Sequence, residues 1–493
     1  MKLMSQQLSF RPAVKTVTGN IDYARFEREL IRIDEILRKS GAEQDFIEKS
    51  VKRYTERGQE AGSQVLAGHI KRHQERSLTV LRSMVLQCLL GEDYRGMSRR
   101  LAECPLFRWF CQIETLDEIR VPSKSVLQTY AQWLPEEEMR EVVGTILRAS
   151  NTERDALELA NDIELNRVWM DSTAIKANIH FPVDWVLLRD AVRTLTKATK
   201  LIREHGLKCR MSDPKTFMSD MNRLSMQMTQ CRRKQDAKPQ RKKTLRKMKR
   251  LVKTVQAHAR SHRELLDRDW KSTDWTRKQA EQVLKRIDGV LELLPQAQKQ
   301  AHERIIGERK VSNAEKILSL YEREARVIVR GKIDAEIEFG NTLLLAEQEN
   351  GIIVDWQMHK ESAPADSKLL QKSIERIEAL TEIKVTDVGT DRGFDSSDNV
   401  AYLEQRNIKN GICPKSPAQL KERMRNRKFV VIQKRRASTE GRIGIFKNVF
   451  VGKPLRAKGF ANRELAISWR ILAHNLWVLA RLKKAEQPQA LAA

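Results

Sequence analysis

The chain has 493 residues, 40% of them hydrophobic, which is enough for roughly two to four domains with buried cores. Its 92 Lys and Arg outnumber 65 Asp and Glu, and the net charge of +27 favours a polyanionic partner. The six Cys form no close CxxC pair, which argues against a zinc site or a disulfide framework. No apolar run approaches the roughly 20 residues of a membrane span, and the N-terminus lacks a signal-peptide core. We therefore expect no membrane association and a cytoplasmic location.

The first 160 residues show an all-helical pattern. Apolar residues recur at helical spacing over residues 23–53 and 77–90, and another helix is predicted over 136–146. Ser123 is placed as the N-cap of a helix whose first turn is small, polar and basic, as in many DNA-recognition helices. The alternative is an ordinary capped helix.

The pattern changes near residue 165. Residues 165–180 predict a strand, a turn near Asp171 and a second extended segment. From residue 184 to about 320 the chain returns to helices, one of which we expect to end at Pro295. Residues 232–250 are densely basic and form either a solvated helix face or a surface that follows phosphates.

Strands and helices alternate after residue 326, which predicts an α/β layer around a mixed sheet. The predicted strands are 327–329, 336–346, 351–356, 384–391 and 411–413, with a turn at 347–351, and the predicted helices are 366–380, 398–406 and 460–482. The strands near residues 168 and 173 would complete this sheet.

Residues 435–447 predict a helix with a charged side. At about 100° per residue, Arg436, Glu440 and Lys447 fall within roughly 60° of one another. A carboxylate between two cations can hold a hard metal ion while the cations hold phosphates. The alternative is a solvated helix with an Arg–Glu pair at i, i+4.

Three carboxylates are candidates for one site. We expect Asp171 and Asp391 at or near strand ends, which converge at one edge of such a sheet, and Glu440 can be added from the packed helix. Three such groups can bind two divalent ions about 3.5–4 Å apart for in-line attack on a phosphodiester. Oxygen ligands favour Mg²⁺ or Mn²⁺.

Three motifs together resemble the DDE-type transposases of bacterial insertion sequences. They are Met170-Asp171-Ser172-Thr173 with Asn178-Ile179-His180-Phe181-Pro182, Gly389-Thr390-Asp391-Arg392-Gly393-Phe394, and Arg436-x3-Glu440-x6-Lys447. The last resembles the Y-x2-R-x3-E-x6-K signature of one large branch, with Gln433 at the Tyr position. In relatives that Tyr is associated with handling a flipped base.

The resemblance implies an RNase H-like catalytic core in an α+β multidomain chain. Asp171, Asp391 and Glu440 would be the catalytic metal ligands for two Mg²⁺ or Mn²⁺ ions, and Arg436 and Lys447 would bind DNA phosphates. The implied division is a helical N-terminal DNA-binding domain (1–160), a catalytic domain (161–183 plus 323–485), a helical basic insertion (184–322) and a disordered tail (486–493).

The implied function is metal-dependent cleavage and strand transfer of double-stranded DNA by a transposase that is dimeric on insertion-sequence ends and located in the bacterial cytoplasm with the nucleoid. Two alternatives stay open: a non-catalytic DNA-binding regulator derived from a transposase, and an RNase H-like nuclease without strand transfer.

Overall fold

The computed structural model describes residues 17–62, 65–113, 119–231, 237–332, 335–452 and 454–485. Within these ranges the protein is an α+β molecule, in which many helices surround one mixed six-stranded sheet. The expected tail, 486–493, lies outside the described residues. The six Cys are free, and no helix of the described chain is long and apolar enough to cross a membrane.

The N-terminal region is helical up to residue 152, as predicted. Its helices are α1 (Ile21–Lys39), α2 (Ala42–Glu60), α3 (Ala67–Leu90), α4 (Tyr94–Glu103), α5 (Pro105–Cys111), α6 (Lys124–Tyr130) and α7 (Glu136–Thr152). Ser123 caps α6 as expected, since its hydroxyl accepts the Val126 N–H. The helical pattern over 23–53 is confirmed as two helices, because Gly41 adopts φ 74° and separates α1 from α2. Helix α2 then continues to Glu60, beyond the end of the helical pattern at residue 53.

The sheet has the order β2-β3-β1-β5-β6, with β4 on the same edge of β3 as β2. Its strands are β1 (Arg167–Lys176), β2 (Arg326–Lys332), β3 (Ala335–Glu347), β4 (Ile353–Met358), β5 (Asp387–Thr390) and β6 (Lys409–Ile412). Strand β3 is antiparallel to β1, β2 and β4, whereas β5 is parallel to both β1 and β6. The strands predicted after residue 326 are therefore confirmed, with ends shifted by a few residues.

The turn expected near Asp171 does not form. Asp171 is the fifth residue of the ten in β1, which runs unbroken between β3 and β5. The polar run Asp171-Ser172-Thr173 resembles a turn by composition, but its antiparallel pairing with residues 343–345 of β3 overrides that local preference. Asp171 is therefore in the middle of a strand, and only Asp391 follows a strand end directly.

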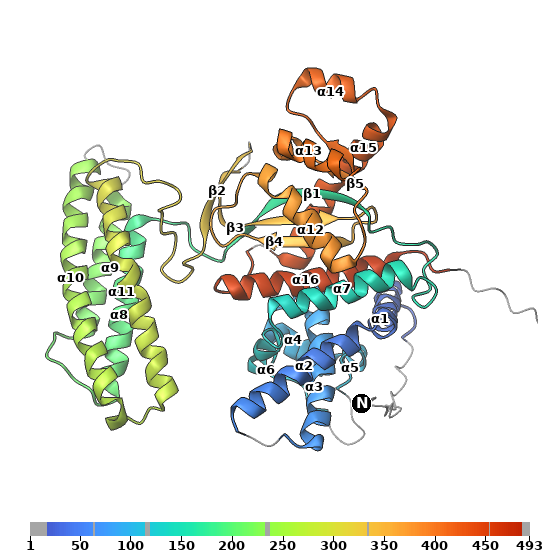
Figure 1. Ribbon diagram of the computed structural model, residues 1–493. Coiled ribbons are helices and arrows are strands. Elements are labelled where there is room, and N and C mark those ends of the chain that lie inside the picture. The colour runs from blue at the N-terminus through green and yellow to red at the C-terminus, as the bar shows by residue number, and fades with distance from the viewer. Residues whose placement is uncertain are drawn as a thin grey trace, which may run out of the picture.

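Helices from the C-terminal part of the chain pack around the sheet (Figure 1). They are α12 (Leu370–Thr381), α13 (Ser397–Gln405), α14 (Pro417–Arg423), α15 (Arg427–Ile445), which continues as a π-helix (Phe446–Val451), and α16 (Phe460–Arg481), with short 3-10 turns at Asp366–Lys368 and Arg392–Phe394. Helix α16 contacts α1, α3 and α7 as well as β4, so it lies between the N-terminal helices and the sheet. The buried side chains of all these parts form one continuous hydrophobic cluster.

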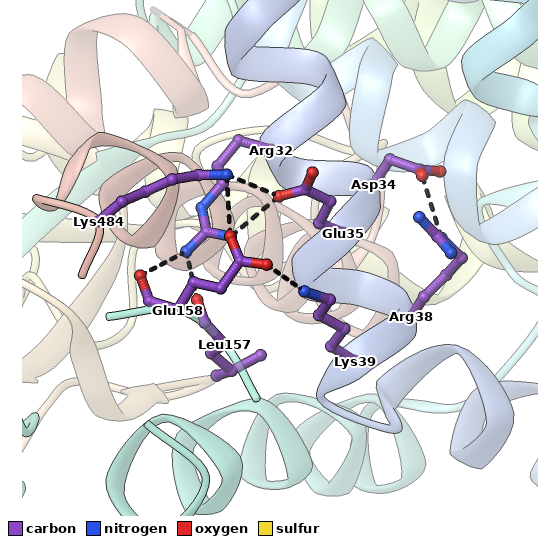
Figure 2. Close-up of polar contacts among 8 residues, drawn as sticks. All are labelled: Arg32, Asp34, Glu35, Arg38, Lys39, Leu157, Glu158 and Lys484. Atoms are coloured by element: carbon purple, nitrogen blue, oxygen red, sulfur yellow. Dashed lines mark hydrogen bonds and ion pairs between the residues drawn. The ribbon is translucent and has the colours of Figure 1, made fainter. Parts of the chain in front are cut away.

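Polar contacts also tie α1 to the C-terminal end of the described chain. Figure 2 shows Glu158 between Lys39 and Lys484, with Nζ–O distances of 2.5 and 3.1 Å. Hydrogen bonds from these two ammonium groups lower the pKa of Glu158 to about 2. Arg32 of α1 donates to the backbone carbonyl of Leu157 beside them. The junction thus joins three segments that are distant in sequence.

Residues between β1 and β2 form a separate helical bundle (Figure 1). Its helices are α8 (Asp184–Glu204), α9 (Pro214–Gln230), α10 (Ala237–Asp269) and α11 (Arg277–Ile305), and they enclose a second hydrophobic cluster. The helix end expected at Pro295 was wrong, since Pro295 lies inside α11. Buried residues on both sides of it, such as Leu294 and Ala297, hold the helix in the bundle despite the missing N–H. The predicted domain boundaries remain a prediction.

Candidate active site

Strands β1 and β5 bring Asp171 and Asp391 next to each other. Their parallel register pairs Val168 with Val388 and Trp169 with Gly389. Continued by two residues, this register places Asp171 opposite Asp391. Because side chains alternate along a strand, two residues at matching positions of neighbouring strands point to the same face. In keeping with this register, the charge of Asp391 raises the pKa of Asp171.

Helix α15 packs on this same face over β1, β5 and β6. Gly389 and Gly411 are paired across β5 and β6, and both lie under the Ile432 side chain. A Cβ atom at Gly411 would be 2.3 Å from Ile432 Cγ2, and one at Gly389 would be 2.7 Å from it. The two glycines therefore allow a close approach that no larger residue would permit. On β1, the Trp169 indole N–H donates to the Ile432 carbonyl at 3.0 Å.

Three alternate residues of β1 face successive parts of this helix and its π-helical extension. Trp169 contacts Ile432, the Asp171 carboxylate feels the charge of Arg436, and Thr173 Oγ1 lies 3.1 Å from Lys447 Nζ. The two predicted phosphate-binding cations are thus both directed toward β1. Glu440 lies between them on the same side of the helix, and its side chain is exposed.

Gln433 anchors Arg436 to the ends of two strands. Its side-chain amide donates to the carbonyls of Thr390, at 3.0 Å, and of Gly411. Its Oε1 atom accepts a hydrogen bond from Arg436 Nε at 3.2 Å. An amide supplies both two donors and an acceptor, a combination that a Tyr hydroxyl does not have. The residue that departs from the Y-x2-R-x3-E-x6-K signature therefore has a definite role in positioning Arg436.

The carboxyl group of Asp171 is hard to ionise. Burial and then the neighbouring charge of Asp391 raise its pKa from 3.8 to about 6, with a further contribution from Asp366. The Ser172 N–H, 2.7 Å from Oδ1, and the Arg436 charge oppose this rise. Two close carboxylates that repel each other form a site whose charge a cation would neutralise.

Asp366 is an acidic neighbour that sequence reasoning missed. It begins the 3-10 turn before α12, and a Cβ atom at Gly393 would lie 2.9 Å from its Oδ2 and 3.0 Å from Asp391 Oδ1. Asp366 therefore lies across Gly393 from Asp391. It belongs to none of the three motifs and reads simply as the start of an amphipathic helix, so no signal in the sequence distinguishes it.

The described residues contain no group of three His, Cys, Asp or Glu side chains placed to hold a metal ion. Asp171 and Asp391 are adjacent, but Glu440 does not complete a cluster with them in this structure. The donor set itself suits a hard cation, because all its atoms are carboxylate oxygens and two of the groups repel each other. The assignment of Asp171, Asp391 and Glu440 as ligands remains a prediction.

Residues 341–476 match the family model described as transposase DDE domain. The chain carries a DDE-type transposase domain. The matched segment contains Asp391, Arg436, Glu440 and Lys447, whereas Asp171 precedes it. Such transposases belong to the polynucleotidyl transferases and nucleases, act on DNA and use divalent metal ions. Neither the curated proteins nor the solved structures compared with the chain gave a match.

Proposed function

We propose that this chain is a DNA transposase that binds insertion-sequence ends and catalyses metal-dependent strand cleavage and strand transfer. The observation that carries the proposal is the pair Asp171 and Asp391 on adjacent parallel strands, with the helix of Arg436, Glu440 and Lys447 packed over them. The transposase DDE domain supplies the reaction class, and the net charge of +27 suits a polyanionic substrate.

The sheet topology supports an RNase H-like core. Leaving out β2, three antiparallel strands in the spatial order β4-β3-β1 are followed by two parallel strands, β5 and β6. Each of the connections from β4 to β5 and from β5 to β6 contains a helix. In this core the bundle is an insertion between the first strand and the strand that pairs with it.

In the proposed mechanism, Asp171, Asp391 and Glu440 would hold two Mg²⁺ or Mn²⁺ ions. Such a pair would supply activation of the attacking water or DNA 3′-hydroxyl and charge stabilisation at the leaving oxygen. Arg436 and Lys447 bind phosphate oxygens of the reacting strand, and Gln433 fixes the guanidinium of Arg436 for that contact. Because the pKa of Asp171 is about 6, its carboxyl group is mostly ionised at neutral pH and is protonated only as the pH falls below that value.

The N-terminal helices are proposed to bind the element ends. Helix α6 starts at the Ser123 cap with Lys124, which is exposed, and it resembles a recognition helix in its first turn. Two ends must be cut, so we propose a dimer on DNA. A bacterial cytoplasmic, nucleoid-associated location follows from this substrate.

The test is cleavage of DNA that carries the flanking element ends, with Mg²⁺, by the native chain and by Asp391→Asn. The variant keeps the size and the hydrogen-bonding reach of the side chain but removes one ligand charge. We expect the native chain to cut, and the variant to bind the ends without cutting. Equal cleavage by both proteins would show that Asp391 is not a ligand.

A target plasmid in the same reaction separates the alternatives. Joining of the freed ends to the plasmid identifies a transposase, whereas cleavage without joining indicates a nuclease with the same core. Tight binding of the ends without cleavage by either protein would favour a non-catalytic regulator.

A further inference from the structure

The outer face of α10 has a concentration of positive charge that the proposed reaction does not use. Between Ala237 and Arg263 the helix has eleven Lys and Arg and no Asp or Glu. Five of these cations are exposed and recur at helical spacing on one side: Lys243, Arg246, Lys247, Arg250 and Lys253. We call these five residues the α10 stripe. Figure 1 shows α10 at the edge of the bundle farthest from the sheet.

The stripe differs from the cations at the two ends of the same helix. Near its start, Lys238 and Lys242 pair with Glu308, and near its end Arg263 pairs with Asp267 and Asp288. None of the five stripe residues forms an ion pair with a residue that the structure describes. Their charges are therefore available to an external anion.

The stripe works against the stability of its own helix. Like charges at i, i+4, such as Lys243 with Lys247 and Arg246 with Arg250, repel each other. The neighbouring helix α11 avoids this, because Glu281, Asp288 and Glu292 are interleaved with its cations. An ordinary solvated face would have mixed signs like that of α11. The uniform sign on α10 raises a positive potential that a polyanion would neutralise.

The dimensions of the stripe suit duplex DNA. At 1.5 Å per residue, Lys243 and Lys253 are separated by about 15 Å along the helix axis, which is comparable with the roughly 12 Å width of the major groove. Cations at the two ends of the stripe can thus reach phosphates on both strands.

We propose that the α10 stripe is a binding site for the phosphate backbone of duplex DNA, separate from the catalytic carboxylates. The choice of DNA rests on the proposed function. The stripe consists of Lys and Arg alone, whose charges neutralise phosphates, and we place its contacts on the backbone, which positions DNA without reading its sequence. The bundle would hold DNA at a distance from the reacting phosphate.

The test compares two full-length variants with equal loss of charge. The stripe variant replaces Lys243, Arg246, Lys247, Arg250 and Lys253 by Gln. The control variant replaces five exposed cations of α11 and the loop after it by Gln as well. These are Lys278, Lys285, Arg286, Lys299 and Lys310. Binding to a short duplex of arbitrary sequence is measured between about 50 and 200 mM salt.

Each phosphate contact contributes about 0.9 to the slope of log affinity against log salt. We expect the slope of the stripe variant to be smaller by roughly 3 to 4 and that of the control to change by less than about 1. The melting temperature of the stripe variant should not fall, since the substitutions remove repulsion. Equal slopes for the two variants would overturn the inference. A second outcome would also overturn it. If the stripe variant binds DNA like the native chain but no longer binds vesicles of phosphatidylglycerol and phosphatidylcholine, the stripe binds an anionic lipid surface instead of DNA.

Cleavage of element-end DNA by the native chain, measured on the same preparation, separates this inference from the proposed function. A smaller slope for the stripe variant together with no cleavage by the native chain would support DNA binding by the stripe and contradict the proposed transposase activity. Normal cleavage together with an unchanged slope would reject the stripe alone.

Discussion

At the scale of single residues, the ionised carboxylate of Asp171 is electrostatically unfavourable in the folded protein. The carboxyl group is mostly buried next to Asp391, and its pKa of about 6 means that the folded protein binds this proton more tightly than the unfolded chain does. Stability from this group is present below its ordinary pKa of 3.8 and is lost as the pH rises through about 6. At neutral pH the ionised group therefore destabilises the metal-free protein, by about 3 kcal/mol at 1.36 kcal/mol per pKa unit.

Asp171→Asn should therefore stabilise the metal-free protein while abolishing cleavage. The amide keeps the acceptor for the Ser172 N–H but has no charge to be repelled by Asp391. We expect a gain in the free energy of unfolding of about 1–3 kcal/mol at pH 8, shrinking between pH 6 and 4. Denaturant unfolding at several pH values measures it, with and without Mg²⁺. A gain that is independent of pH would contradict the electrostatic explanation.

Gln433→Met tests the role of Gln433 in holding Arg436. Met has a similar length but cannot accept the Arg436 hydrogen bond or donate to Thr390 and Gly411. A misplaced phosphate-binding group commonly costs about 10- to 100-fold in rate, so we expect cleavage to fall by that range. Lys434→Met, at the exposed neighbouring position, is the matched control and should cleave like the native chain. Equal rates for the two variants would exclude a positioning role.

At the scale of elements, the close packing of α15 on β5 and β6 depends on Gly389 and Gly411. Gly411→Ala would place a Cβ atom 2.3 Å from Ile432 Cγ2 and 2.5 Å from the Val388 carbonyl oxygen, so strand and helix must separate. We expect a loss of about 1–3 kcal/mol in the free energy of unfolding and slower cleavage. Gly441→Ala on the same helix meets no atom within 4 Å and should be neutral or stabilising by up to about 1 kcal/mol. Thermal unfolding of both variants tests the difference.

The sequence predicted elements well where local pattern and packing agree. Strands β3 to β6 and helices α12, α13 and α16 follow from alternation, helical spacing and turn residues. The pattern failed where tertiary contacts decide the outcome. Asp171 and Thr173 of β1 lie on the strand face that α15 covers, and Pro295 is tolerated because α11 is packed on both sides of it. The motifs led to Asp171 and Asp391, but the proximity of Asp366 depends on a loop whose path no motif encodes.

At the scale of the whole molecule, the buried apolar side chains form two large clusters. The first joins the N-terminal helices to the sheet through α16, so these two predicted domains share one core. Buried Asp355 of β4 adds a polar link, since it pairs with Arg140 of α7 and Arg376 of α12. The second cluster belongs to the bundle alone. Movement between the N-terminal helices and the sheet would break a core, whereas movement of the bundle would not.

The bundle should therefore fold by itself. Its two ends are fastened together, because Arg304 pairs with buried Asp184 at 2.9 Å and Gln300 bonds both Asp184 and the Ile317 backbone. Glu322, just after these residues, is also buried but pairs with Arg463 of α16 outside the bundle. A fragment of residues 183–321 ends before Glu322 and therefore does not include either partner of that ion pair. We expect this fragment to be helical and to unfold cooperatively, as its own hydrophobic core requires. Arg304→Met in the fragment leaves Asp184 without its cation and should lower the melting temperature, by about 3–4 °C for each kcal/mol lost. Circular dichroism and calorimetry on both fragments measure this, and a fragment without a cooperative transition would show that the bundle depends on the sheet for its fold.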